Sequence, residues 1–345
     1  MADTKYTILG MSGAGKTCFI TGMYMRMSVG MDGFTLVTDD DTRIKLERDI
    51  QTLRRTTGQA RFPEATVNDI DAIKRYEFRM SYAREKIITF EMIDYAGGSL
   101  NAGGEVYEKV CQSIAESTAL LIIVDGALLC SEDKDERREN VYFDCAMTIT
   151  PVIQTFADKH PGEPLPPIVF VVTKSDLCKQ YVQESEIVSL IKEYFSPAFC
   201  ENTTSYICAI SLGDTISDDD YKGKFSPINI HIPFFIGAYH DFYNRCLFRK
   251  HQMEDANMKL EMERTSKVSQ YEQENRKWLF KRKDYLAKLE ADIKQNRVAR
   301  DKNLSIFDLT KELFIKFGTR LEIESNNFKS FIDGVEQTGF KSFRL

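Results

Sequence analysis

The sequence has no long apolar run. Its longest runs, residues 119–124 and 168–172, fall far short of the roughly 18 residues that a membrane-spanning helix requires. The first residues also lack a charged region followed by an apolar stretch and a cleavage site, so we expect no secretory signal. These absences predict a cytoplasmic protein that does not insert into a membrane.

The chain is also poor in the patterns that hold zinc. It has four histidines, and its eight cysteines form no CxxC pair, so the ligand spacing of a structural zinc site is missing. Reduced, partly buried thiols are the expectation instead. Positive charge is not in excess, because 46 Lys and Arg face 52 Asp and Glu for a net charge of -6. We therefore expect no nucleic-acid partner.

Size and composition set the scale of the fold. With 345 residues, the chain is long enough for two domains, and 43% hydrophobic residues can fill at least one large core. This excludes a wholly disordered chain and a small disulfide-stapled protein. No internal repeat or low-complexity segment is evident.

Short β-branched runs alternate with longer amphipathic stretches over the first two-thirds of the chain. This order predicts an α/β fold with a mostly parallel sheet and helices on both faces. Only residues 83–85 separate the second and third expected strands, so that pair should be antiparallel and form one reversed edge. The expected strands are residues 5–9, 75–82, 86–93, 119–125, 168–173 and 206–210, and the expected helices are residues 17–27, 42–55, 105–115, 136–159 and 184–195.

The last third of the chain has a different composition. Residues 238–317 contain neither Gly nor Pro, which is typical of helix. As one helix this stretch would reach roughly 120 Å, so a hairpin that folds back is at least as plausible. We expect an α/β domain over residues 1–245 and a C-terminal helical region, a hairpin, stalk or coiled-coil-like structure, over residues 246–345. Its apolar positions serve either its own packing or a partner.

A phosphate-binding loop follows the first expected strand. Residues 10–17, GMSGAGKT, match G-x-x-x-x-G-K-[ST] between a strand and a helix. Glycines let backbone N–H groups converge on phosphate oxygens at a helix N-terminus. Lys16 adds a positive charge near the β- and γ-phosphates, and the Thr17 hydroxyl is a hard oxygen ligand for Mg²⁺. The expected phosphate-binding residues are Ser12, Gly13, Ala14, Gly15, Lys16, Thr17 and Cys18.

An acidic turn, DYAG at residues 94–97, follows the apolar strand of residues 87–93. This order places Asp94 at the carboxyl edge of the sheet beside the phosphate loop, where a carboxylate is needed near Mg²⁺. Gly97 would offer its backbone N–H to a γ-phosphate. The glycine pairs at 97–98 and 103–104 suit a loop whose order depends on that phosphate.

A base-reading loop is expected at residues 173–176, TKSD, after the buried run of residues 168–172. The Asp176 carboxylate can accept from both the ring N–H and the exocyclic amine of guanine, donors that adenine does not present together. The stem of Lys174 can cover the base or ribose while its ammonium stays near the phosphate loop. Within residues 208–210, CAI, the Ala209 N–H could donate to the guanine carbonyl oxygen.

In this order, GMSGAGKT, DYAG, TKSD and CAI resemble the four boxes of the Ras-like, translation-factor-related P-loop GTPases over roughly residues 4–211. The family's Asn-Lys-x-Asp box begins here with Thr173, whose hydroxyl can still tie the base loop to the phosphate loop, and Cys208 replaces the serine of the Ser-Ala-x box. The resemblance implies GTP or GDP and Mg²⁺ as cofactors. The further nucleotide-binding residues that it implies are Thr173, Lys174, Asp176, Cys208 and Ala209.

A switch threonine is expected between the first helix and the next paired strand. Thr66, in residues 61–66 (RFPEAT), is the first choice, and together with the helical insert of residues 39–55 it resembles the prokaryotic double-GTPase family. Its spacing of 28 residues before Asp94 fits a plain hairpin. The metal ligands expected on this basis are Thr17, Thr66 and Asp94.

Thr57 is the competing threonine, and it stands 37 residues before Asp94. Its surroundings resemble the heterotrimeric G proteins, with Arg54 or Arg55 as an internal arginine finger. A third alternative is that both threonines belong to ordinary loops.

Catalysis lacks one familiar group, because Ras-like members usually carry a water-orienting Gln where this chain has Gly98. Positioning and charge neutralisation can still support slow GTP hydrolysis, with Lys16, Thr66 and Gly97 as the catalytic set. We expect a switch that relays its nucleotide state through the switch loops and C-terminal helices to a protein partner or a second copy. A P-loop kinase or ATPase and a scaffold with a non-hydrolysed nucleotide are the alternatives.

Overall fold

The computed structural model describes residues 4–55, 62, 73–95, 104–214, 216, 223–274 and 282–345. Contacts divide the chain into two compact units. The first comprises Met1–His240 and Leu321–Lys341, and the second comprises Asp241–Arg320 and Ser342–Leu345. The domain boundary expected after residue 245 lies near His240, where the chain first passes from the first unit to the second. The sequence did not indicate that residues 321–341 return to the first unit.

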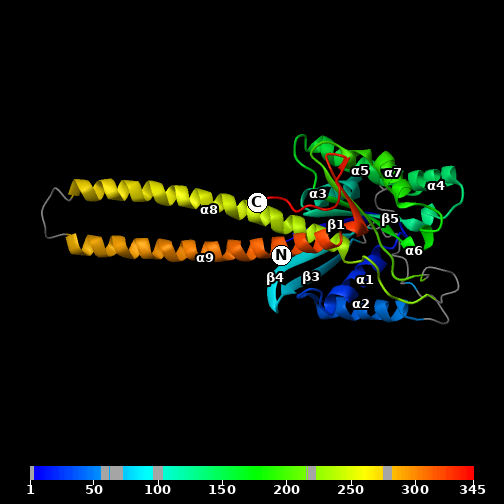
Figure 1. Cartoon of the computed structure of the whole chain (residues 1–345), viewed down its shortest axis with the longest axis horizontal. Coiled ribbons are helices and arrows are strands. Elements are labelled where there is room, and N and C mark those ends of the chain that lie inside the picture. Colours follow the sequence, from blue (N-terminus) through cyan, green and yellow to red (C-terminus); the bar gives the residue numbers. More distant parts are fainter. Residues whose placement is uncertain are drawn as a thin grey trace. The chain divides into compact units, whose positions relative to one another are not determined.

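A mixed sheet of nine strands runs through the described part of the first unit (Figure 1). Its order is β2-β3-β4-β1-β5-β6-β7-β8-β9, and the five central strands from β4 to β7 are parallel. This confirms the expected α/β class with an antiparallel hairpin, β3–β4, toward one edge. The strands are β1 (Thr4–Gly10), β2 (Phe34–Thr38), β3 (Lys74–Tyr82), β4 (Glu85–Asp94), β5 (Ala119–Asp125), β6 (Ile168–Thr173), β7 (Thr204–Ala209), β8 (Phe328–Ile332) and β9 (Val335–Glu336).

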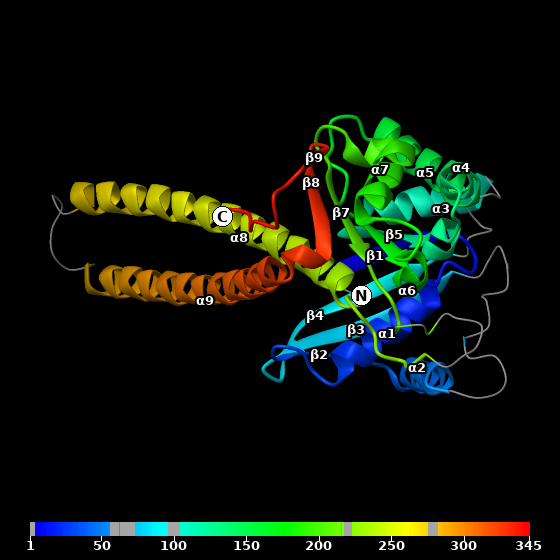
Figure 2. The ribbon, with the colours of Figure 1, turned by 45° about the vertical axis from the view of Figure 1, so that its right-hand side comes forward.

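Helices cover both faces of this sheet (Figure 2). Most of them begin and end within two residues of their expected bounds. The helices of the first unit are α1 (Lys16–Ser28), α2 (Asp40–Leu53), α3 (Gly104–Ala115), α4 (Lys134–Val141), α5 (Met147–Lys159), α6 (Ser175–Cys178) and α7 (Glu184–Tyr194), with short turns η2 (Gly126–Leu129), η4 (Ser196–Phe199) and η5 (Ser325–Asn327).

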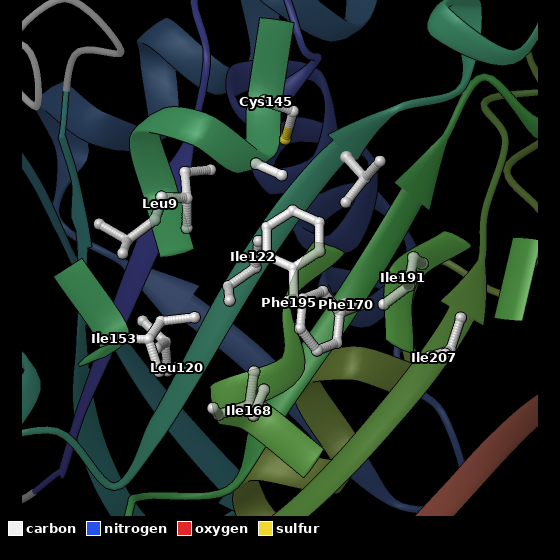
Figure 3. Close-up of a cluster of buried hydrophobic side chains, with 14 of the residues drawn as sticks. Leu9, Leu120, Ile122, Cys145, Ile153, Ile168, Phe170, Ile191, Phe195 and Ile207 are labelled. Carbon is white, nitrogen blue, oxygen red and sulfur yellow. The ribbon is translucent and has the colours of Figure 1, made fainter. Parts of the chain in front are cut away.

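Two apolar layers hold the sheet between these helices. On one face, β1, β5, β6 and β7 pack against α3, α5 and α7, and Figure 3 shows part of this cluster, including Phe170, Phe195 and Ile153. On the other face, aromatic rings of the strands meet the first turns of α8, as where Phe234 lies 4.8 Å from Phe90 between ring centroids. Burial of these apolar side chains supplies the main free energy that stabilises the sheet.

The helix expected over residues 136–159 is interrupted. A π-helical turn, η3 (Tyr142–Ala146), separates α4 from α5. Pro151 lies inside α5 and has no N–H group to donate to the carbonyl oxygen of Met147, the residue that directly follows this turn. Single π-helical turns often mark functional positions in helices. Periodicity alone does not reveal such a one-residue insertion.

Two edges of the sheet were not expected from sequence. β2 pairs antiparallel with β3, and β8 pairs antiparallel with β7. β8 lies within residues 246–345, for which the sequence predicted a helical region, and its Phe328 and Phe331 are buried in the sheet. Short edge strands depend on a partner strand far away in sequence, so local patterns identify them poorly.

The second unit is built on two long helices, α8 (Ile232–Glu274) and α9 (Arg282–Ile323). They run antiparallel (Figure 1), so the hairpin alternative, not a single helix, is the one present. The rings of Phe242 and Phe317 stack with centroids 5.6 Å apart, and Tyr243 lies 5.6 Å from Phe314. No helix within the described ranges is long and apolar enough to cross a membrane.

Candidate functional site

The expected site lies where the parallel strands end. The carboxyl ends of β1, β4, β5, β6 and β7 share one edge of the sheet, and the loops that follow them carry the sequence motifs. Ligands of open α/β sheets bind at this edge. The fold therefore brings the four motifs together from positions up to two hundred residues apart.

The phosphate loop joins β1 to α1. Gly13 and Gly15 have φ angles of 80° and 94°, in the left-handed region that favours glycine. Gly15 precedes α1, and its carbonyl accepts a hydrogen bond from Phe19 N at 2.8 Å. These two conformations turn the backbone so that the loop caps the helix N-terminus, where an anion is stabilised. Ser12 is exposed on this loop.

Lys16 is buried beneath the loop, with 7% of its surface exposed. Its Nζ donates to the carbonyl oxygens of Gly10 at 2.8 Å and Met11 at 3.0 Å. Burial lowers the pKa of Lys16, and the negative charge of Asp94 opposes that shift. The ammonium is therefore held beneath the phosphate loop by two backbone carbonyl oxygens. A phosphate oxygen could replace these carbonyls as its acceptor.

Asp94 ends β4 and is only 2% exposed. Its Oδ1 has no hydrogen-bond partner among the described residues. Burial raises the pKa of Asp94, while the positive charges of Lys16 and Lys74 lower it. An ionised carboxylate in such a place needs a cation, and Mg²⁺ prefers oxygen ligands.

A magnesium ion fits this donor set. The half-buried Thr17 offers a hydroxyl from the first turn of α1, and the unsatisfied Asp94 oxygen offers a carboxylate. Within the described residues, no group of three His, Cys, Asp or Glu side chains could hold a metal ion without other ligands. A cation here would therefore depend on nucleotide oxygens and water, as Mg²⁺ commonly does.

The base loop is tied directly to the phosphate loop. Thr173 Oγ1 donates to the Ala14 carbonyl at 2.8 Å, which confirms the expected role of this hydroxyl. Lys174 adopts a left-handed conformation, with φ at 50°, and its Nζ contacts Gly13 O at 3.2 Å and Asp125 Oδ2 at 2.7 Å. The ammonium of Lys174 thus lies beside the phosphate loop, as expected.

Asp125 was not among the residues expected from sequence. It ends β5, an apolar strand whose position beside β1 and β6 places its carboxylate at the same edge. The signal that could have identified it is a lone acidic residue directly after a buried run, the same signal that identified Asp94.

Asp176 lies in α6 with 9% of its surface exposed. Ser175 N donates to Ile210 O at 3.1 Å, so the base loop is held against the residues that follow β7. Ala209 is half-buried there, and its carbonyl accepts from Asn229 Nδ2 at 3.2 Å. The two segments expected to read a base are therefore adjacent.

Two cysteines of the expected set differ in placement. Cys208 is fully buried in β7, and its thiol lies 3.8 Å from Asn327 O, so its side chain serves packing and only its backbone remains a candidate contact. Cys18 is half-buried in α1, and burial raises the pKa of its thiol to about 12. Cys18 is therefore a neutral thiol at physiological pH.

The expected switch residues fall on segments that the structure does not describe. Thr66, Thr57, Gly97 and Gly98 lie outside the described residues. Arg54 and Arg55 follow α2 and are exposed. The choice between the two threonines, and the roles given to Gly97 and Thr66, therefore stay predictions.

A cleft of about 580 Å³ adjoins the phosphate loop. One wall comes from the loop and the ends of β5, and the other from η3 and the start of α5. None of the residues on that second wall was expected from sequence, because only the fold brings them to the loop. They are Phe143, Asp144, Cys145, Met147 and Thr148.

Several solved structures are similar to this chain. The complex of the signal recognition particle receptor SRb-GTP with SRX from Chaetomium thermophilum has 15% identity and a TM-score of 0.40, and the alignment covers 68% of this chain and 97% of that one. A GTP-binding protein from Sulfolobus solfataricus in complex with GDP has 13% identity and a TM-score of 0.33, with coverage of 68% and 52%. The Ski7 GTPase-like domain of S. cerevisiae bound to GTP has 13% identity and a TM-score of 0.37, and the alignment covers 63% of this chain and 44% of that one. No curated protein matches the chain.

A family model matches one continuous part of the sequence. The model named Double-GTPase 2 aligns with residues 7–216, which is more than half of the 345 residues. The matched region runs from β1 past β7 and contains the phosphate loop, the acidic turn and the base loop. The chain belongs to the Double-GTPase 2 family of P-loop GTPases.

Proposed function

We propose that this protein is a Mg²⁺-dependent guanine-nucleotide switch that hydrolyses GTP slowly and relays its nucleotide state through its C-terminal helices. The observation that carries the proposal is the direct tie between the base loop and the phosphate loop. Thr173 binds Ala14 O and Lys174 binds Gly13 O, so both ends of a nucleotide would meet one connected surface.

Guanine preference is supported by the carboxylate of Asp176. It directly follows a segment that is fixed by the bond from Thr173 Oγ1 to Ala14 O and by the bond from Ser175 N to Ile210 O. A fixed carboxylate can distinguish guanine, which offers two adjacent donors, from adenine, which does not. The same arrangement argues against a kinase or ATPase of relaxed base preference.

The residues of the phosphate loop and its surroundings support slow hydrolysis. Lys16 and the amides of the glycine loop would bind phosphate oxygens and stabilise developing charge. Thr17 and Asp94 would hold Mg²⁺, which supplies further neutralisation of phosphate charge when bound. Gly98 offers no side chain to orient water. We expect a partner or self-association to accelerate the reaction.

A chain of contacts supports relay toward the helices. Asn229 Nδ2 donates to Ala209 O at the end of the base-reading strand. Two residues later, His231 Nε2 lies 2.8 Å and 3.0 Å from the two carboxylate oxygens of Glu324. His231 directly precedes α8 and Glu324 directly follows α9, so this buried pair joins the two helix ends next to the site.

A cytoplasmic location is part of the proposal. All eight cysteines are free thiols, and Cys200 is exposed. Exposed free thiols persist in a reducing compartment.

Calorimetry of the full chain with GTP, GDP and ATP, with and without Mg²⁺, tests the proposal. We expect binding of both guanine nucleotides and much weaker binding of ATP. Asp176→Asn should reduce GTP affinity at least about tenfold and reduce the discrimination against ATP, because the amide can no longer accept two hydrogen bonds. Asp135→Asn, an exposed position on α4, is the matched control. No heat of binding with either guanine nucleotide would refute the proposal.

A further inference from the structure

A groove on the helical hairpin combines arginines with exposed apolar side chains. It has a volume of about 370 Å³ and lies mainly on α8, with one residue from α9. Phe248 is 63% exposed and Ile306 is 39% exposed, which leaves apolar surface open to a partner. The groove is lined by Arg245, Phe248, Arg249, Gln252, Met253 and Ile306.

Arg249 makes the groove suited to a hydrogen-bond acceptor. Its Nη1 is buried and has no hydrogen-bond acceptor among the described residues. Burial lowers the pKa of Arg249, and the like charge of Arg245 lowers it further. Arg245 donates to Asp241 at 2.7 Å through its Nε. A carboxylate from outside would supply the acceptor that Arg249 lacks, since guanidinium and carboxylate form strong charge-assisted bonds.

The charge of the chain is divided unevenly between the part that carries this groove and the rest. Residues 241–320 contain 19 Lys and Arg against 13 Asp and Glu, whereas the rest of the chain contains 27 against 39. The hairpin therefore carries a surplus of 6 positive charges, and the remainder an excess of 12 negative ones. Surfaces of opposite sign on one chain favour contacts between two copies of it.

The acidic part of the chain has an exposed apolar surface of its own at η3. Tyr142, Phe143 and Met147 are 42%, 56% and 52% exposed, and Asp144 is exposed among them. The rings of Tyr142 and Phe143 contact each other at 4.9 Å between centroids. We name this the η3 face, defined by these four residues. It offers apolar contacts to the exposed apolar side chains of the groove and one carboxylate, the acceptor that Arg249 lacks.

We propose that the groove of one copy binds the η3 face of a second copy. Phe143 and Met147 would pack against Phe248, Met253 and Ile306, and Asp144 would pair with Arg249. The contact joins different surfaces of the two copies, so it builds rings or open chains as well as dimers. The inference gives the proposed function its partner, and its test requires no nucleotide.

Sedimentation velocity of the nucleotide-free full chain over a concentration series tests the proposal. The mass should rise above the 39.7 kDa of one chain as concentration rises, and it should fall with added salt. Arg249→Glu should weaken association at least about tenfold, as expected for a buried interfacial charge. Lys250→Glu carries the same change in charge on the exposed neighbouring residue outside the groove, and it should behave like the unchanged chain.

A charge swap makes the test specific to the two surfaces. Asp144→Arg and Arg249→Glu chains should each stay monomeric alone and should associate when mixed, because the reversed pair can then form. Circular dichroism and thermal melting should show that both variants are folded. A monomer at every concentration, equal effects of Arg249→Glu and Lys250→Glu, or no association in the mixture would each overturn the inference. Nucleotide binding measured separately by calorimetry keeps this outcome apart from a failure of the proposed function.

Discussion

The bond between Thr173 and the phosphate loop offers a sharp test of how the site is held together. Thr173→Val keeps the shape of the side chain and replaces its hydroxyl with a methyl group. Ala14 O would then lose its 2.8 Å donor, and Val124 O would lose a weaker one at 3.3 Å. Ala14 and Thr173 are 2% and 5% exposed, so water cannot readily replace the donor.

The expected cost follows from that burial. A buried carbonyl left without a partner costs about 1–3 kcal/mol, so the free energy of unfolding should fall by about 2 kcal/mol. The phosphate loop would also lose one of its two fixed contacts to the base loop. If this populates loop conformations that do not bind, the affinity for GDP should fall by up to about tenfold.

Urea unfolding followed by calorimetry with GDP measures both effects on one protein sample. Thr173→Ser is the control, because it keeps the hydroxyl and loses one methyl group, a change of about 0.8 kcal/mol. The serine variant should therefore bind GDP nearly as well as the unchanged chain. A valine variant of unaltered stability and affinity, or a serine variant that binds as poorly as valine, would show that the hydrogen bond does not organise the site.

Two further predictions concern buried carboxylates. Asp94→Asn should raise the melting temperature of the nucleotide-free protein at pH 7 while removing the Mg²⁺-dependent part of GTP binding, because burial disfavours the charged carboxylate more than the nearby lysines stabilise it. Burial raises the folded pKa of Asp94 above its unfolded value, so the folded state binds protons more tightly and the ionised group costs stability as pH rises. The advantage of the asparagine should therefore shrink as the pH is lowered toward 4, and an advantage that grows instead would contradict the sign. Glu324→Ala leaves His231 without its buried partner and should lower the free energy of unfolding by about 3 kcal/mol. Hydrogen exchange at the start of α8 should become faster. Unchanged exchange there would show that the pair is not part of the proposed relay.

The central strands could be read from the sequence because their signals are local. Residues 119–124 and 168–172 are continuous apolar runs, as expected for parallel strands covered on both faces. In the structure, β5 and β6 begin with these runs and end one residue beyond them. The GMSGAGKT and TKSD motifs likewise carry their chemistry in adjacent residues. Their positions after strands then fixed the edge of the sheet at which they meet.

Other elements had no local signal strong enough to identify them. β8 exists because Phe328 pairs with Cys208, a residue 120 positions earlier, and β9 has only two residues. The π-helical turn η3 inserts one residue in a helix whose periodicity otherwise continues on both sides. The cleft beside the phosphate loop depends on that turn, so it could not be foreseen either.

The sequence by itself determined the class of the fold, the phosphate loop and the kind of base loop, because these depend on residue type and near spacing. Only the tertiary structure decided which groups meet. The bond from Thr173 to Ala14 joins residues 159 positions apart, and that from His231 to Glu324 joins residues 93 apart. Such contacts form when burial of apolar surface aligns whole strands and helices, and that energy is spread over the core rather than encoded beside the residues that it brings together.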